Sequence, residues 1–190
     1  MWRTRVGYAG GDRSDPTYHD LGDQTECFQV DFDPEKIAFA DLVETALLAH
    51  NPTWVAHRPQ YASLILAHDE AQLHVAIEVA ARFSARIGGK RLATRIEPLK
   101  AFWLAEDYHQ KYHLRQDRVL MADFRALLGD EDAALRESTA AARVNGYVAG
   151  DGSNAQLTRE VDLLGLGDVG RSRLISLVKR AGDGIGCPVD

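Results

Sequence analysis

The sequence has few cysteines and no long apolar run. Its 190 residues contain two cysteines, Cys27 and Cys187, too few and too far apart for a disulfide framework or a metal site. No apolar stretch approaches the roughly 20 residues that cross a bilayer. No charged and then apolar leader precedes the first strand pattern. These absences favour a cytoplasmic protein without a membrane-spanning segment.

An excess of positive charge is also lacking. The chain has 22 Lys and Arg against 28 Asp and Glu, which gives a formal net charge of -6. Because this charge repels other polyanions, neither nucleic acid nor a membrane surface is expected as a partner. The apolar fraction of 45% is ordinary for a globular protein, and the length suffices for one domain with a substantial core.

Strand and helix patterns alternate through the first hundred residues. Alternating or continuous apolar runs predict strands, and apolar residues at helical spacing predict helices. The expected strands cover residues 2–9, 26–34, 61–67 and 92–99, and the expected helices cover residues 39–50 and 70–87. Asp69 and Gln72 resemble a capping box for the second helix. The predicted fold class is α/β or α+β, with helices packed on a mixed sheet.

The remainder of the chain predicts helices only. Helices are expected over residues 105–112, 116–128 and 131–144, with further helices beginning at Ser153 and Asp168. The last helix should bury Leu174, Ile175, Leu177 and Val178. We therefore expect an α/β domain at residues 1–114 and a C-terminal helical extension at residues 115–181. The glycine-rich tail at residues 182–190 should be mobile and should expose Cys187.

Glu26 is the first candidate for chemistry. Strand alternation places it on the same side as Phe28 and Val30, while Cys27 and Gln29 point to the other side. A carboxyl group on an apolar face is desolvated, which raises its pKa toward the range where it donates a proton near neutrality. The alternative is that Glu26 lies at the frayed end of the strand and extends into water.

Histidines and tyrosines supply further candidates. His109 and His113 are four residues apart on an expected helix, a spacing compatible with zinc, but no third ligand clusters with them and a solvated helix is the better interpretation. Tyr18 and Tyr61 are each compatible with a core phenol. Both lie at the edges of elements that border the Glu26 strand, so their hydroxyl groups could converge on one pocket.

Ordered segments through residues 1–115 carry a family resemblance. They include Thr4-Arg5-Val6-Gly7-Tyr8-Ala9-Gly10-Gly11, Gly22-Asp23-Gln24-Thr25-Glu26, Gln60-Tyr61-Ala62-Ser63 and Ala105-Glu106-Asp107-Tyr108-His109-Gln110. In this order they resemble the peptide methionine sulfoxide reductase family of the A type, MsrA, whose fold is ferredoxin-like. The later helices resemble an extension carried by one bacterial branch of that family.

The resemblance implies a peptide-methionine (S)-S-oxide reductase that repairs oxidised methionine, free or in proteins. In the family, a thiolate attacks the sulfoxide sulfur, a glutamate protonates the oxygen and two tyrosine hydroxyl groups hold that oxygen. Glu26 matches the glutamate, and Tyr18 and Tyr61 match the tyrosines. A thioredoxin-like reductant restores the enzyme from its sulfenic acid. No cofactor is implied, and a monomer is expected.

The sequence departs from the family in one decisive respect. The family's nucleophilic cysteine lies in a Gly-Cys-Phe-Trp-Gly segment upstream of the glycine turn, and this segment is absent from the 190 residues. Cys27 points to the opposite face of the strand from Glu26 and cannot replace the missing nucleophilic cysteine. Cys187 resembles a recycling cysteine. Gln24 stands where the family has His, and no acidic residue precedes Tyr61 in its loop.

Three interpretations follow from the missing segment. The first is a reductase truncated at its N-terminus, with its first strand and helix missing, whose cysteine or selenocysteine is encoded upstream and which is inactive as written. The second is a catalytically dead binding module that captures methionine sulfoxide without turnover. The third is a structural relic with an exposed apolar patch where the missing elements would pack.

Overall fold

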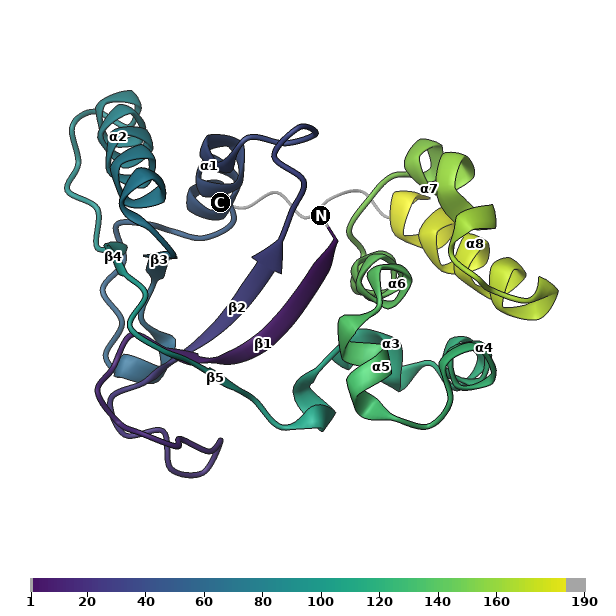
Figure 1. Cartoon of the computed structure of the whole chain (residues 1–190). Helices are drawn as coiled ribbons and strands as arrows, with labels where there is room; N and C mark the ends of the chain where they lie inside the picture. The colour runs from purple at the N-terminus through teal and green to yellow at the C-terminus, as the bar shows by residue number, and fades with distance from the viewer. Residues whose placement is uncertain (1, 184–190) are drawn as a thin grey trace. The chain divides into compact units, whose positions relative to one another are not determined.

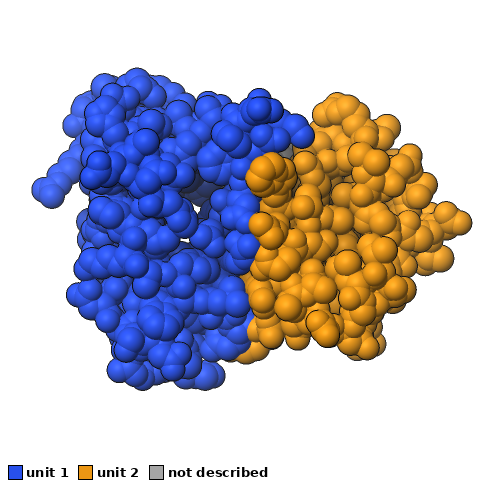
Figure 2. All heavy atoms as spheres, viewed as in Figure 1, with its two compact units in different colours: residues 1, 5–106 blue, residues 2–4, 107–190 orange. Residues whose placement is uncertain are grey.

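The computed structural model describes residues 2–183, so Cys187 and most of the expected tail lie outside the described residues. The chain divides into two compact units, coloured separately in Figure 2: residues 5–106 form one, and residues 2–4 with residues 107 onward form the other. The first unit combines strands and helices, and the second is helical. The predicted α/β fold class with a C-terminal helical extension is confirmed, although the strands form two small sheets in place of one mixed sheet.

The strands of the α/β unit form two small sheets. Strand β1 (Arg3–Ala9) lies between β2 (Thr25–Asp31) and β5 (Phe102–Leu104), and it pairs antiparallel with β5. Strands β3 (Leu64–Ala67) and β4 (Arg95–Pro98) pair in parallel in a separate sheet. The four expected strands are therefore present, each over a shorter range than expected. The sequence does not predict β5, because three residues are too few to show alternation.

Two helices pack together beside the β3–β4 pair (Figure 1). They are α1 (Phe39–Leu48) and α2 (Glu70–Arg86), close to the expected ranges. Their shared core contains Val43, Leu47, Ala76, Val79, Ala80 and Phe83. Asp69 caps α2 by accepting the Gln72 backbone N–H at 2.7 Å, and Gln72 Oε1 accepts the His68 N–H at 3.1 Å. The predicted capping pair is confirmed, although the return bond reaches His68.

Short helices make up the second unit. Its elements are η2 (Asp107–His109), α3 (Tyr112–Gln116), α4 (Arg118–Leu128), α5 (Asp132–Glu137), α6 (Thr139–Ala149), α7 (Asn154–Glu160), η3 (Val161–Leu163) and α8 (Asp168–Asp183). Leu120, Phe124, Val144, Leu174 and Val178 lie in one core, and Ile175 and Leu177 pack against it. The expected inward face of α8 is confirmed.

Two helix boundaries differ from the prediction. The expected helix over residues 105–112 is wrong, because Lys111 adopts the left-handed conformation (φ 53°) and separates η2 from α3. The expected helix over residues 131–144 is two helices, because Ser138 Oγ accepts the Ala141 N–H at 3.1 Å and starts α6. Asn145 does not end that helix; its side chain accepts the Leu114 N–H at 3.1 Å instead.

Lys111 explains why the first residues of the chain belong to the helical unit. Its side chain is buried, with 4% of the residue exposed. Its ammonium donates to the carbonyl oxygens of Thr4 at 2.6 Å and Arg136 at 3.0 Å. Arg3 forms an ion pair with Glu137 at 3.1 Å. Residues 2–4 are thereby attached to the α5 region, while β1 continues into the α/β unit.

Asp117 connects α4 to α8. One of its oxygens accepts the backbone N–H groups of Val119 and Leu120 at 3.1 and 3.2 Å, which caps α4. The other accepts Arg173 Nε at 2.7 Å. Burial raises the pKa of Asp117, but the hydrogen bonds from Arg173 and from the two backbone N–H groups outweigh it and hold that pKa below its ordinary value.

A second carboxylate of α4 holds the beginning of α8. Asp123 Oδ2 accepts the Gly167 N–H at 3.0 Å. A Cβ atom placed on Gly170 would lie 1.9 Å from the same oxygen and 3.0 Å from its Cγ. Glycine at position 170 therefore leaves the space in which the Asp123 carboxylate reaches the Gly167 N–H.

Substitution of Gly170 tests this approach. Gly170→Ala should destabilise the protein by about 1–3 kcal/mol, because the new methyl group displaces Asp123 from the Gly167 N–H. Gly146→Ala is the matched control: it also lies in a helix, has nothing within 4 Å of its Cβ position, and should gain about 0.5–1 kcal/mol. Urea unfolding measures both, and equal effects of the two substitutions would contradict the packing argument.

Asp117 should contribute stability that is lost in acid. A group with a lowered folded pKa stabilises above its unfolded pKa of about 3.9, and the contribution disappears as pH falls through the folded pKa. Asp117→Ala should cost about 1–2 kcal/mol at neutral pH because the cap is lost. Asp117→Asn keeps a capping side chain, so it should cost less and should reduce the acid dependence. Urea unfolding between neutral and acidic pH measures these changes; an unaltered pH profile in Asp117→Asn would refute them.

Candidate functional site

The two faces of β2 are those that its alternation predicts, but at Glu26 and Phe28 the expected burial is reversed. Glu26 is exposed, and Phe28 is 69% exposed. Cys27 and Gln29, on the other face, are half-buried. The expectation that Glu26 is desolvated is therefore wrong. At Glu26 and Phe28 this face is open to solvent, whereas Val30 farther along it is half-buried. The carboxyl group of Glu26 therefore meets water, as the alternative interpretation held.

Polar contacts account for the half-buried face. Arg5 on β1 donates to Gln29 Oε1 at 3.2 Å and forms an ion pair with Asp31 at 3.2 Å. Gln29 also contacts His68 Nε2 at 3.2 Å, just beyond the end of β3. These charge-assisted and neutral hydrogen bonds hold this side of β2 against β1 and His68, while Phe28 on the other side is exposed.

A short 3-10 helix, η1 (Pro59–Tyr61), is joined to β2 by two hydrogen bonds. Thr25 Oγ1 donates to the Pro59 carbonyl at 2.7 Å, and Gln60 Nε2 donates to Glu26 Oε1 at 2.7 Å. The expected strand start at Tyr61 is wrong, since Tyr61 is the last residue of η1 and is 55% exposed. These contacts bring Gln60 and the element that carries Tyr61 to Glu26.

Tyr18 belongs to a loop that is held at both ends. Its backbone N–H donates to Glu106 Oε1 at 3.0 Å, and the other oxygen of Glu106 accepts the hydroxyl group of the buried Tyr8 at 2.7 Å. The buried Gln24 accepts the Gly11 N–H at 3.0 Å and donates to the Arg13 carbonyl at 2.7 Å. Gln24, at the family's histidine position, therefore orders the loop.

Three predicted site residues thus lie on three ordered elements. Glu26 is in contact with Gln60, Tyr61 lies beside that contact, and Tyr18 is 41% exposed on its loop. The approach of the Tyr18 hydroxyl to Glu26 stays a prediction. Sequence reasoning missed Gln60, although its place next to Tyr61 was the available signal.

Cys27 has none of the features of an activated thiol. Burial raises its pKa to about 11, against smaller lowering effects of the Ala9 backbone and Arg95. It also lies on the face of β2 opposite to Glu26. Among residues 2–183 it is the single cysteine, and Cys187 lies outside the described residues.

The histidine pair does not form a metal site. His109 lies in η2 and His113 in α3, on either side of the left-handed Lys111, so they do not share one helix face. Within residues 2–183 no three His, Cys, Asp or Glu side chains cluster in a way that could hold a metal ion. In the same range, no helix has the length and apolar character needed to cross a bilayer.

Comparison with known proteins covers both units. A family model described as "Peptide methionine sulfoxide reductase" matches residues 1–140. A second model, described as "Selenoprotein methionine sulfoxide reductase A, helical domain", matches residues 128–179. The two models together account for the α/β unit and most of the helical unit.

Individual relatives agree with the family models. A peptide methionine sulfoxide reductase of Drosophila melanogaster is 38% identical over 167 residues, covering 86% of this chain and 65% of the relative. The A5 enzyme of Oryza sativa is 34% identical over 153 residues, covering 77% of this chain and 59% of the relative. The chain therefore spans about three fifths of the length of these relatives.

Solved structures give the same result. Methionine sulfoxide reductase A of Corynebacterium diphtheriae superposes with a TM-score of 0.53 at 32% identity, covering 61% of this chain and 64% of that chain. Reduced Mxr1 of Saccharomyces cerevisiae superposes with a TM-score of 0.53 at 31% identity, covering 60% and 70%. On these matches, the chain belongs to the peptide methionine sulfoxide reductase family.

Proposed function

We propose that this chain carries the oxygen-binding residues of a peptide-methionine (S)-S-oxide reductase. Glu26 protonates the sulfoxide oxygen, and the hydroxyl groups of Tyr18 and Tyr61 donate hydrogen bonds to it. The observation that carries the proposal is the hydrogen bond from Gln60 to Glu26, since it fixes the element of one tyrosine against the carboxylate within the region that matches the family.

The chemical step requires a thiol. A thiolate attacks the sulfoxide sulfur, the sulfur–oxygen bond breaks, and the oxygen is transferred to the thiol as a sulfenic acid while the methionine thioether is released. A thioredoxin-like reductant then removes the sulfenic acid through a disulfide. We place the working protein in the cytoplasm, as a monomer that repairs oxidised proteins.

Among residues 2–183 the site lacks two parts that the reaction needs: an activated thiol, and side chains that shield Glu26 from water. Cys27 is on the wrong face of β2 and its pKa is raised to about 11. Because Cys187 resembles a recycling cysteine, we assign the nucleophile to a polypeptide segment other than these 190 residues. General acids act best when shielded from water. We propose that the segment supplying the thiol also covers Phe28 and thereby shields Glu26.

The raised pKa of Cys27 also favours a second function, that of a binding module for methionine sulfoxide. Without an activated thiol, the chain would bind methionine sulfoxide and release it unchanged. The two functions share the binding residues and differ in turnover, so a single set of experiments separates them.

Binding and turnover of methionine sulfoxide test the proposal directly. The 190-residue chain should bind a methionine (S)-sulfoxide peptide in preference to the (R)-epimer and should show no dithiothreitol-dependent turnover. Tyr61→Phe should weaken binding roughly five- to tenfold, the cost of about one hydrogen bond. Tyr112→Phe is the control, because Tyr112 is equally exposed at 55% but lies in the helical unit. Calorimetry measures both.

The outcomes distinguish the alternatives. If neither epimer gives heat on binding, the binding role of Tyr18, Glu26 and Tyr61 is refuted. Turnover by the 190-residue chain would refute the assignment of the nucleophile to another segment. If an upstream in-frame Gly-Cys-Phe-Trp-Gly segment restores turnover when it is included, the reductase is favoured over the binding module.

Cys27 should resist alkylation at neutral pH. Because its pKa is raised to about 11, iodoacetamide should modify it roughly ten- to a hundredfold more slowly than free cysteine near pH 7.5. The rate should keep increasing with pH up to about 11. Mass spectrometry of tryptic peptides separates Cys27 from Cys187, and the denatured chain provides the unprotected reference. Native modification at the reference rate would contradict the inert assignment.

A further inference from the structure

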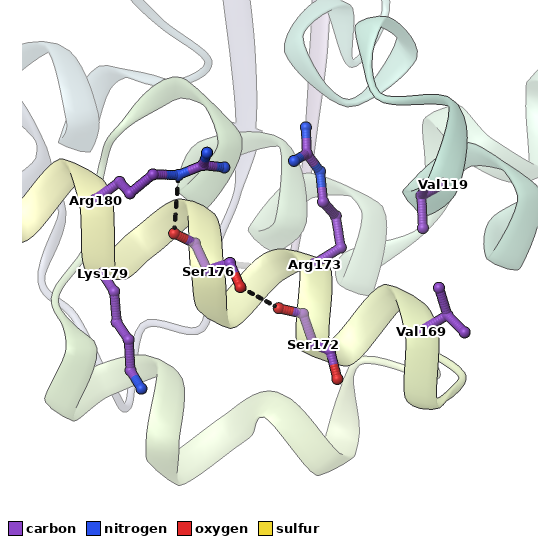
Figure 3. Close-up of a pocket in the computed structure, with 7 residues that line it drawn as sticks. All are labelled: Val119, Val169, Ser172, Arg173, Ser176, Lys179 and Arg180. Carbon is purple, nitrogen blue, oxygen red and sulfur yellow. Dashed lines mark hydrogen bonds between the residues drawn. The ribbon is translucent and has the colours of Figure 1, made fainter.

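The outer face of α8 lines an open groove in the helical unit. Its buried face carries Leu174 and Val178, so residues at the complementary helical spacing point away from the core. The groove has a volume of about 570 Å³. It is lined by Val119, Val169, Ser172, Arg173, Ser176, Lys179 and Arg180 (Figure 3). Only Val119 comes from another element, α4.

The groove is basic on a protein that is acidic. Three of the lining residues, Arg173, Lys179 and Arg180, are cationic and none is acidic, whereas the whole chain has a net charge of -6. In Figure 3 the guanidinium groups of Arg173 and Arg180 lie on the same side of α8, and Lys179 extends to the other side. Cations therefore border both sides of the central face.

Internal bonds use only part of this charge. Arg173 engages Asp117 through Nε, and Arg180 donates from Nε to the Ser176 carbonyl at 3.2 Å. Among residues 2–183 the terminal N–H donors of both guanidinium groups have no hydrogen-bond partner. In the same range Lys179 forms neither a hydrogen bond nor an ion pair. The groove thus offers donors that carboxylates recognise strongly.

The middle of the groove is lined by small side chains. Ser176 Oγ donates to the Ser172 carbonyl at 2.9 Å, which holds it close to the helix surface. Because serine projects little, another backbone can approach α8 between the cations. Val169, 73% exposed, and Val119, 38% exposed, form an apolar end. The groove therefore has an apolar end and an end that carries Lys179 and Arg180, and Arg173 and the two serines lie between these ends.

We propose that this groove docks a short acidic peptide segment of a partner protein. Its carboxylates pair with Arg173, Lys179 and Arg180, and an apolar side chain packs on Val119 and Val169. From Val169 to Arg180 the helix rises about 16 Å, which an extended segment of about five residues spans. The proposal is independent of sulfoxide chemistry, because no groove residue belongs to that site.

Charge and shape favour this occupant over other anions. A nucleic acid or an anionic membrane extends beyond the groove and meets the repulsion of a chain with net charge -6. Inorganic phosphate would use the cations but not the two valines. A short acidic segment with one apolar residue matches both ends, and its attraction remains local within a Debye length of about 8–10 Å.

The test uses the full 190-residue chain and a defined probe, a fluorescein-labelled Leu-Glu-Asp-Glu-Leu peptide followed by anisotropy. Its matched control replaces the acids by their amides, Leu-Gln-Asn-Gln-Leu. The acidic peptide should bind roughly tenfold more tightly than the amide peptide, and its affinity should fall roughly fivefold between about 50 and about 300 mM NaCl.

Two double variants locate the binding. Lys179→Glu with Arg180→Glu should reduce affinity roughly tenfold or more. Lys90→Glu with Arg91→Glu is the control, since it alters an exposed Lys-Arg pair by the same charge in the other unit and should leave affinity within about twofold. Circular dichroism checks folding, and the milder Lys179→Gln with Arg180→Gln, with a smaller expected loss, replaces the first variant if it unfolds.

Several results would overturn the proposal. Equal losses in the two Lys-Arg variants would mean that only net charge matters. Equal affinity for the acidic and amide peptides would remove the role of the cations. Competition by millimolar inorganic phosphate alone would indicate a small-anion site. Binding of phosphatidylglycerol vesicles in the absence of peptide binding would assign the groove to a membrane surface.

Discussion

The two-residue period of β2 is the constraint on which the candidate site depends. Neighbouring side chains in a strand point to opposite faces, so Glu26 and Cys27 cannot act on the same substrate atom. Arg5 fixes which face is turned inward through its contacts with Gln29 and Asp31. Once that orientation is set, Glu26 and Phe28 point outward together, on the face opposite to Cys27.

The helical unit depends on a different kind of interaction: carboxylates at the start of α4 and within it accept hydrogen bonds from α8 and from the residue before it. Asp117 caps its own helix and binds Arg173, while Asp123 accepts the N–H of Gly167, the residue just before α8. Both acids accept backbone N–H groups at the start of a helix, where these donors have no partner within the helix. Asp117 also pairs with a guanidinium group. The same contacts hold Arg173 at the edge of the α8 groove, so the architecture of the unit and its basic surface have a common origin.

The sequence predicted elements whose signals are local. The apolar spacing of α1 and α2, the Asp69 cap and the Ser153 cap all act within a few residues, and each is present. It failed where tertiary contacts decide. The left-handed Lys111 depends on acceptors from Thr4 and Arg136, and Asn145 continues a helix because it bonds to Leu114. The prediction that Glu26 is buried was wrong for a related reason, because alternation defines the two faces of a strand but not which face is covered.

The attachment of Thr4 to Lys111 makes the helical unit discontinuous in sequence. A stretch beginning at residue 107 would retain the buried ammonium and lose the Thr4 carbonyl that it bonds. Leaving buried charge short of acceptors is costly. Recombination by a single cut at residue 107 would therefore lose this contact, whereas a transfer that also carried residues 2–4 would keep it.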